Sequence, residues 1–264
     1  MNPSSQWGHA AWPDLRDRRA GPPIGRVCLL PVGAIEQHGP HLPCDTDTVI
    51  AQALCAAAAA RSGCVALPPL AYGCSFGHAE AWPGTLSLDP ETLTATIRQL
   101  GSWLLATGFD RLLVINSHFG NWAAIRCAID HLRLRHAGAI HVGACNSWEL
   151  SPEVKAWFVS DGDDIHANRA ETSLLMHLAP DSVVHARVAD ADDPDRTAGL
   201  VFSWLVSQTS TNGVTGSPSL ATAEEGELWF GRMVDALAAM VAKAAVEEAP
   251  IAWAPPDGHG RLIS

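Results

Sequence analysis

Basic residues are scarce in this sequence of 264 residues: 17 Lys and Arg stand against 28 Asp and Glu, a formal net charge of −11. A face that binds nucleic acid needs clustered Lys and Arg to pair with phosphates. We therefore expect no nucleic-acid partner. Apolar residues make up 47% of the chain and charged residues 17%, which is the composition of a globular protein with a sizeable core.

Long apolar runs and paired cysteine motifs are also missing. The apolar runs end before the roughly 20 residues that a membrane-spanning helix needs, and the N-terminal segment is polar and rich in Pro and Arg. We therefore expect no membrane contact and a cytoplasmic protein. The seven cysteines are odd in number and lack Cys-x-x-Cys spacing, which favours free thiols over disulfides or a cysteine-bound zinc ion.

Strand-like and helix-like segments alternate through the first half of the chain. Short continuous apolar runs are typical of strands buried on both faces, and they occur at 26–32, 64–67, 111–115 and 139–145. Helices are expected between them, at 48–61, 89–107 and 122–136. This alternation predicts an α/β fold, a three-layer α/β/α sandwich with a mostly parallel central sheet, formed as a single domain over residues 1–264.

The rest of the chain is less regular. We expect an irregular or short-helical lead-in over 1–25 and a helix that ends near 178. The run 201–206 is a candidate strand, and 221–247 has the pattern of a long amphipathic closing helix.

Three polar loops, 33–47, 72–87 and 116–121, each follow a predicted strand. In parallel sheets the carboxyl ends of the strands meet at one edge, where ligands bind. We therefore expect these loops to lie together.

Carboxylates and imidazoles gather in these loops. Glu36, His38 and Asp47 fall in the first loop, His118 follows a neighbouring strand, and Glu171 begins a later helix. Carboxylates and imidazoles without thiolates suit Zn²⁺ or Mn²⁺. Each residue alone has a plainer interpretation as a loop carboxylate, a satisfied histidine or, for Glu171, a partner of its own helix N-terminus. The residues by themselves leave both interpretations open.

Four sequence blocks, in this order, resemble the creatininase family of creatinine amidohydrolases and their relatives. They are Pro31–Pro43 with Thr46–Thr48, Trp82–Ser87, Asn116–Asn121, and His166–Ala167 with Glu171–Ser173. The resemblance implies an α/β/α fold, two divalent metal ions per subunit (Zn²⁺, Mn²⁺ or Fe²⁺) and a homo-oligomer, commonly a hexamer. It also implies hydrolysis of non-peptide C–N bonds, with one branch of the family cleaving a small peptide.

The resemblance also implies roles for individual residues. Glu36, Asp47 and His118 would hold one metal ion, and His38 and Asp47 would help to hold the second, so that Asp47 bridges. Creatininase has a metal-binding Glu where this sequence has Gly120, so Glu171 is expected to complete the second site. This departure also makes creatinine itself less expected as the substrate. His166 matches the proton-transfer histidine of the family and is the expected catalytic residue.

Candidate substrate-binding residues are His78, Glu80, Trp82 and Phe119, with a plain structural role equally open for each. Ten Trp against one Tyr hint at an aromatic-walled pocket. We expect a metal-dependent amidohydrolase that cleaves a cyclic amide, a formamide or a related small molecule. The alternatives are a peptidase of the same family that trims a modified peptide, and a non-catalytic scaffold or binding protein with a crippled site.

Overall fold

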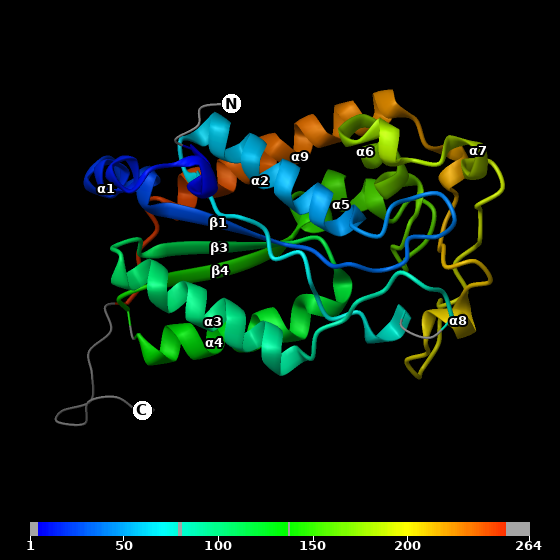
Figure 1. Ribbon diagram of the computed structural model, residues 1–264, viewed down its shortest axis with the longest axis horizontal. Helices are drawn as coiled ribbons and strands as arrows, with labels where there is room; N and C mark the ends of the chain where they lie inside the picture. Colours follow the sequence, from blue (N-terminus) through cyan, green and yellow to red (C-terminus); the bar gives the residue numbers. More distant parts are fainter. Residues whose placement is uncertain (1–4, 79–80, 137, 252–264) are drawn as a thin grey trace.

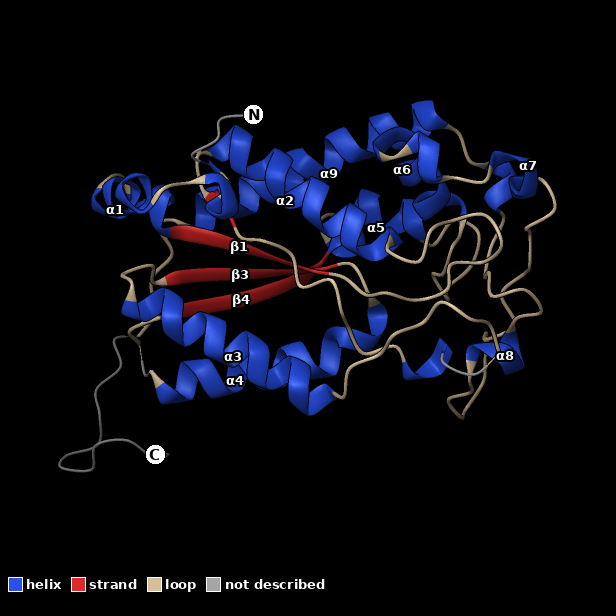
Figure 2. Ribbon diagram, in the orientation of Figure 1, coloured by secondary structure: helices blue, strands red, loops and turns tan. Residues whose placement is uncertain are grey.

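The structure, a computed structural model, describes residues 5–78, 81–136 and 138–251. Its centre is a sheet of four parallel strands in the order β2-β1-β3-β4 (Figure 2). The strands are β1 (Val27–Val32), β2 (Val65–Ala66), β3 (Arg111–Asn116) and β4 (His141–Asn146). The register pairs Val32 of β1 with Asn116 of β3, so these two strands end at the same level. The predicted parallel sheet is confirmed.

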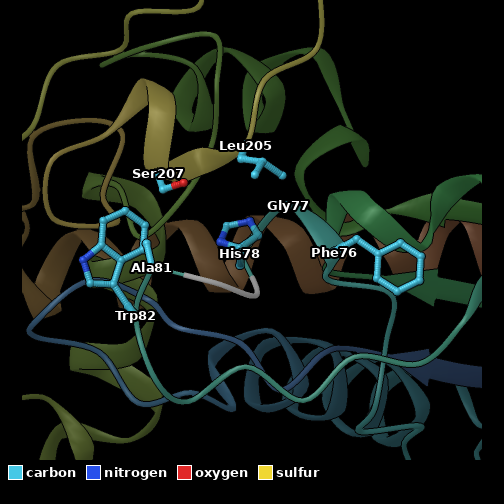
Figure 3. Close-up of a pocket in the computed structure, with 7 residues that line it drawn as sticks. All are labelled: Phe76, Gly77, His78, Ala81, Trp82, Leu205 and Ser207. Carbon is cyan, nitrogen blue, oxygen red and sulfur yellow. The ribbon is translucent and has the colours of Figure 1, made fainter.

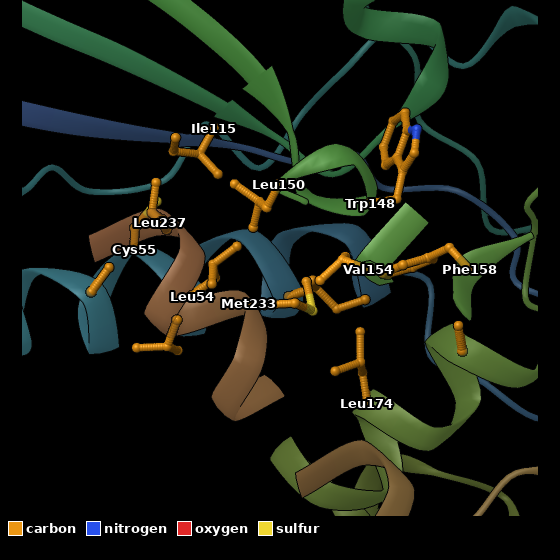
Figure 4. Close-up of a cluster of buried hydrophobic side chains, with 14 of the residues drawn as sticks. Leu54, Cys55, Ile115, Trp148, Leu150, Val154, Phe158, Leu174, Met233 and Leu237 are labelled. Carbon is orange, nitrogen blue, oxygen red and sulfur yellow. The ribbon is translucent and has the colours of Figure 1, made fainter. Parts of the chain in front are cut away.

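Helices cover both faces of the sheet, which gives three layers (Figure 1). One face carries α2 (Thr46–Ser62), α5 (Pro152–Phe158), α6 (Arg169–Leu178) and α9 (Ala223–Ala244). The other face carries α3 (Pro90–Ala106) and α4 (Trp122–Arg135). Each face has its own core of buried side chains. In the first core, Leu54, Leu174 and Leu237 meet from α2, α6 and α9 (Figure 4). The predicted α/β/α sandwich is therefore confirmed.

Shorter helices lie outside these layers: α1 (Trp12–Ala20), α7 (His185–Val188) and α8 (Val206–Thr209). The predicted strand over 201–206 is wrong. This apolar segment lies at the surface, with Val201 89% exposed and Phe202 73% exposed, and it leads into α8. Apolar sequence alone does not make a strand when no neighbouring strand is within reach. None of the helices in the described ranges is long and apolar enough to cross a membrane.

The loop that follows β1 packs closely against the start of α2. A Cβ on Gly33 would lie 2.5 Å from the backbone nitrogen of Thr48, so only glycine permits this approach. The approach brings Glu36, in the loop, to Asp47, in the first turn of the helix. On the same face of the sheet, α6 is capped by Asn168, whose side chain accepts a hydrogen bond from the backbone N–H of Glu171. Local backbone chemistry thus places two carboxylate-bearing segments at the edge where the strands end.

Candidate metal centre

Six side chains that the sequence predicts for the site come together at the carboxyl ends of β1 and β3. All are buried, with no more than 6% of any residue exposed. They are Glu36, His38, Asp47, His118, His166 and Glu171. Their potential ligand atoms form overlapping groups within 4.8 Å, among them Glu36 with Asp47 and His118, and His38 with His166 and Glu171. His78 of the loop 72–87 forms a further such group with Glu36 and His166, so all three polar loops lie together, as predicted, and the start of α6 joins them.

His118 directs its Nδ1 at two carboxylates. Its Nε2 lies 2.8 Å from the carbonyl oxygen of Cys74, which only accepts, so Nε2 carries the hydrogen. In the neutral ring Nδ1 then holds a lone pair, and it lies 3.2 Å from Glu36 Oε1 and 3.2 Å from Asp47 Oδ2. Burial would lower the pKa of His118, but Glu36 and Asp47 raise it well above its ordinary value, so a proton takes the place of a metal ion on Nδ1 in the metal-free chain.

His38 repeats this arrangement on the other side of Asp47. Its Nδ1 donates to the carbonyl oxygen of Glu36 at 3.1 Å, which leaves Nε2 facing Asp47 Oδ1 at 3.3 Å. Backbone carbonyls that fix the outer nitrogen of a histidine are typical of metal ligands. Because His38 faces one oxygen of Asp47 and His118 the other, Asp47 is placed to serve two centres.

Three buried atoms at this site have no hydrogen-bond partner: Glu36 Oε2, His38 Nε2 and Asp47 Oδ2. Leaving such atoms unpaired costs roughly 1–3 kcal/mol each, and more for charged groups. The side chains therefore fit divalent cations, which would satisfy all three atoms.

Without a metal ion, protons take the place of the missing cations. Burial alone would raise the pKa of Glu36, but His118 and His78 lower it to about 2. Burial also opposes ionisation of Asp47, yet His38 and His118 hold its pKa below the ordinary value. Burial would lower the pKa of His38, but Asp47 raises it to about 10. The carboxylates are thus ionised at neutral pH and attract positive charge.

Glu171 uses one of its oxygens to shape the backbone. Its Oε2 accepts a hydrogen bond of 2.6 Å from the backbone N–H of Ala167, while Asn168 caps its own N–H at 3.1 Å. Burial raises the pKa of Glu171 to about 8, and the charge of Asp47 adds to the shift. The plainer interpretation, a carboxylate that stabilises its helix start, accounts for Oε2. The remaining oxygen is left for the group that includes His38 and His166.

Gly120 has no room for a side chain. A Cβ built there would overlap the carbonyl oxygen of Cys74 and lie 2.7 Å from His118 Nε2. The creatininase Glu therefore cannot be restored at this position without moving the carbonyl that orients His118. The backbone of Cys74 occupies the space beside Gly120, and the carboxylate of Glu171 approaches the cluster from α6 instead.

Replacing this glycine tests the fit. We expect Gly120→Ala to lower the free energy of unfolding by about 1–3 kcal/mol, because the added methyl group overpacks a fixed backbone. Gly231→Ala is the matched control, since a Cβ there meets nothing within 4 Å. Urea unfolding of both variants measures the difference. Equal stability of Gly120→Ala and wild type would contradict the expectation, because it would show that the backbone at Cys74 can move to make room for the methyl group.

The metal-free chain should also lose stability as pH rises from 6.5 to 8.5. His38 has a folded-state pKa of about 10, above its unfolded value, so its contribution is complete below pH 6.5 and declines above it. Glu171, with its pKa raised to about 8, acts in the same direction. Melting temperatures measured in EDTA should fall by at least about 2 °C over this window. His38→Gln should flatten the slope, and a rise in wild type would contradict the expectation.

A cavity of about 230 Å³ opens beside the site. His78 and Trp82 line it, together with Phe76, Gly77, Ala81, Leu205 and Ser207 (Figure 3). His78 is the lining residue that connects the cavity to the cluster, because its Nε2 lies 3.7 Å from Glu36 Oε2. Two of the candidate substrate residues are thus at the cavity.

The other two candidate substrate residues are placed differently. Phe119 is not among the lining residues; it is 80% exposed and stacks on Trp148 with ring centres 6.3 Å apart. Glu80 lies outside the described residues.

Two neutral amides that the sequence interpretation overlooked organise the site. Asn121 accepts the N–H of Cys74 at 2.8 Å and donates to the carbonyl of Gly33 at 2.9 Å, so it ties the first two loops together. Gln37 contacts both His78 and His166. Asn121 closes the polar block after β3, which was a usable signal. Gln37 carries no charge, and its only signal in the sequence was its place between Glu36 and His38.

Comparison with known proteins agrees with this geometry. Residues 8–241 match the family described as creatininase, creatinine amidohydrolase. The chain is 37% identical over 245 residues to the mycofactocin precursor peptide peptidase of Mycobacterium ulcerans (strain Agy99), covering 87% of each chain. It is 34% identical over 242 residues to the creatinine amidohydrolase of Pseudomonas putida, covering 86% of this chain and 92% of the relative.

Solved structures give the same result. A crystal structure of creatinine amidohydrolase (creatininase) superposes with a TM-score of 0.81 at 32% identity, over 92% of this chain and 99% of the other. A structure described as creatininase Mn superposes with a TM-score of 0.79 at 30% identity, with the same coverage. The matches extend over nearly the whole chain, and this protein therefore belongs to the creatininase family of hydrolases.

Proposed function

We propose that this protein is a metal-dependent amidohydrolase that holds two divalent ions per chain and cleaves the C–N bond of a small amide. The observation that carries the proposal is the buried cluster of Glu36, His38 and Asp47, in which Glu36 Oε2, His38 Nε2 and Asp47 Oδ2 have no hydrogen-bond partner. Glu36, Asp47 and His118 would hold one ion, and His38, Asp47 and Glu171 the other. Imidazole and carboxylate ligands suit Zn²⁺ or Mn²⁺, with Fe²⁺ also acceptable.

Two such ions, when bound, would lower the pKa of a water molecule to about 7 and polarise the substrate carbonyl. The protein supplies the remaining functions. His166 presents Nδ1 to the site 3.5 Å from Glu36 Oε1, and its burial together with the charges of His78 and His38 keeps its pKa well below the ordinary value. It is therefore neutral at pH 7, so it can take up a proton on Nδ1 and then pass that proton to the leaving nitrogen, a role worth roughly 10²–10⁴-fold.

The size of the cavity favours a small substrate. Its volume of about 230 Å³ is below the roughly 300–1,000 Å³ of sites for drug-sized ligands. The aromatic rings of Phe76 and Trp82 in its wall suit a flat amide or ring.

Peptide trimming is the second candidate, because the relative at 37% identity is a peptide peptidase. The exposed ring of Phe119 and the half-exposed ring of Phe76 add apolar surface, on which a peptide side chain could rest.

Metal analysis followed by a substrate panel tests the proposal. The chain should retain about two Zn²⁺ or Mn²⁺ ions after gel filtration and hydrolyse at least one lactam, hydantoin-like ring, formamide, urea or short peptide. Fewer than about one ion per chain, with no hydrolysis after Zn²⁺ or Mn²⁺ is added, would favour a non-catalytic scaffold instead. Light scattering in the same experiment measures the subunit number, for which the family resemblance predicts a homo-oligomer.

A further inference from the structure

The side chain of Gln37 connects four segments of the site while remaining only 4% exposed. Its Oε1 accepts the backbone N–H of Gly39 at 2.9 Å. Because that N–H can only donate, the oxygen and nitrogen of the amide are assigned without ambiguity. Its Nε2 therefore provides two N–H groups, and three atoms lie within reach of them: the carbonyl of Gly213, His78 Nδ1 and His166 Nε2.

Counting hydrogens decides which of the three atoms receive them. The carbonyl of Gly213, at 3.1 Å, only accepts and takes one N–H. His166 Nε2 lies 2.9 Å from the backbone carbonyl of Gln37, which only accepts, and 3.0 Å from Gln37 Nε2; we assign it a hydrogen that it donates to the carbonyl, the shorter of the two contacts. The second N–H of the amide is left for His78 Nδ1 at 3.1 Å. His78 must then carry its own hydrogen on Nε2.

The two imidazoles consequently show different atoms to the same carboxylate. His166 directs a lone pair on Nδ1 toward Glu36 Oε1 at 3.5 Å, whereas His78 directs an N–H on Nε2 toward Glu36 Oε2 at 3.7 Å. The rings lie 4.3 Å apart, centre to centre. The cavity wall includes His78.

We propose that Gln37 is a positioning residue that gives His78 and His166 opposite hydrogen-bonding character, His78 as a donor and His166 as an acceptor. The two protonation patterns do not depend on the proposed function; only the roles of His78 Nε2 and His166 Nδ1 during hydrolysis rest on it. There, His166 accepts and returns a proton, and His78 donates a hydrogen bond to an oxygen of the substrate in the cavity.

Nitrogen NMR of the histidine rings tests the assignment directly. In ¹⁵N-labelled, metal-free protein at pH 8, two-bond proton–nitrogen spectra report which ring nitrogen is protonated, and His78→Asn and His166→Asn identify the signals. We expect both rings of wild type to be protonated at Nε2. Gln37→Glu offers His78 an acceptor in place of a donor, so His78 should become protonated at Nδ1. Wild-type His78 protonated at Nδ1, or a spectrum that Gln37→Glu leaves unchanged, overturns the proposal.

A second variant displaces the side chain of Gln37 by a substitution at Gly213, which is not one of the proposed metal ligands. A Cβ on Gly213 would overlap the amide oxygen of Gln37, with its carbon only 2.6 Å away. Gly213→Ala should therefore alter the His78 signals. Gly199→Ala is the matched control, because its φ of +77° resembles the +82° of Gly213 but its Cβ meets nothing within 4 Å. Identical His78 spectra for the two variants would contradict the role of Gln37.

Zinc binding and turnover separate this inference from the proposed function. Gln37→Met should retain the zinc of wild type, while kcat on whichever panel substrate is hydrolysed falls at least roughly tenfold. Loss of zinc in this variant would mean that Gln37 supports the metal ligands instead, and would overturn the division of roles. If wild type binds no metal, the proposed function fails while the NMR result still decides the positioning role.

Discussion

Asp47→Asn should leave the chain unable to hold either metal ion. Asp47 faces His118 with one oxygen and His38 with the other, so both halves of the site depend on it. Changing an outer partner of a metal ligand alone costs roughly 10–100-fold in affinity. Losing the bridging ligand should therefore weaken zinc binding by more than about 100-fold and reduce hydrolysis to below about 1% of wild type. Equilibrium dialysis and turnover on the panel substrate measure the two effects.

Asp45→Asn provides the matched control. Asp45 stands two positions earlier, at the start of the same helix, but it is exposed and its side chain makes no capping hydrogen bond. This variant should bind two ions and turn over normally. If Asp45→Asn and Asp47→Asn behave alike, the loss reflects disturbance of the start of α2 rather than loss of a ligand.

Glu171→Gln should reduce the metal content from two ions per chain to about one. The amide oxygen of Gln can still accept the N–H of Ala167, so the start of α6 is preserved while the negative charge is lost. His38 and Asp47 then lack the third ligand that Gly120 cannot supply. Hydrolysis should fall by at least about 100-fold, because the reaction is expected to need both ions. Metal analysis by mass spectrometry counts the ions.

Glu225→Gln is a demanding control for Glu171. Glu225 binds Arg169 at 2.9 Å and Trp157 at 2.9 Å, so it anchors α6 from α9 without reaching the site. This variant should lower thermal stability and keep both ions. Two ions and full activity in Glu171→Gln would instead mean that another group completes the second site, with His166 next in position.

The layers of the fold were predictable because they follow from periodicity. Each buried run ends in a polar loop, and parallel strands can only gather such loops at one edge. This is why Glu36 and His118, far apart in sequence, were expected together and lie 3.2 Å apart. The start of α6 was predictable as well, since Asn168 and Glu171 have the spacing of a helix cap.

Other features depend on contacts that a single sequence does not reveal. The run 201–206 is as apolar as the strands, yet it does not join the four-stranded sheet and most of its apolar side chains are exposed. Gly120 looked like a missing ligand, whereas the carbonyl of Cys74 occupies the space that a side chain would need. The role of Gln37 depends on the positions of Gly39 and Gly213, which pattern reasoning cannot supply.

The spacing of the site residues along the chain has a consequence for unfolding. His38 and Asp47 precede β2, and Glu171 follows β4, so one ion held by these three residues would cross-link segments more than a hundred residues apart. All seven cysteines are free thiols, which leaves such cross-linking to the metal. Closing a loop of that length removes chain entropy worth roughly 4–5 kcal/mol from the unfolded state. The same ions that would serve hydrolysis would thus also stabilise the fold by linking its N-terminal and C-terminal halves.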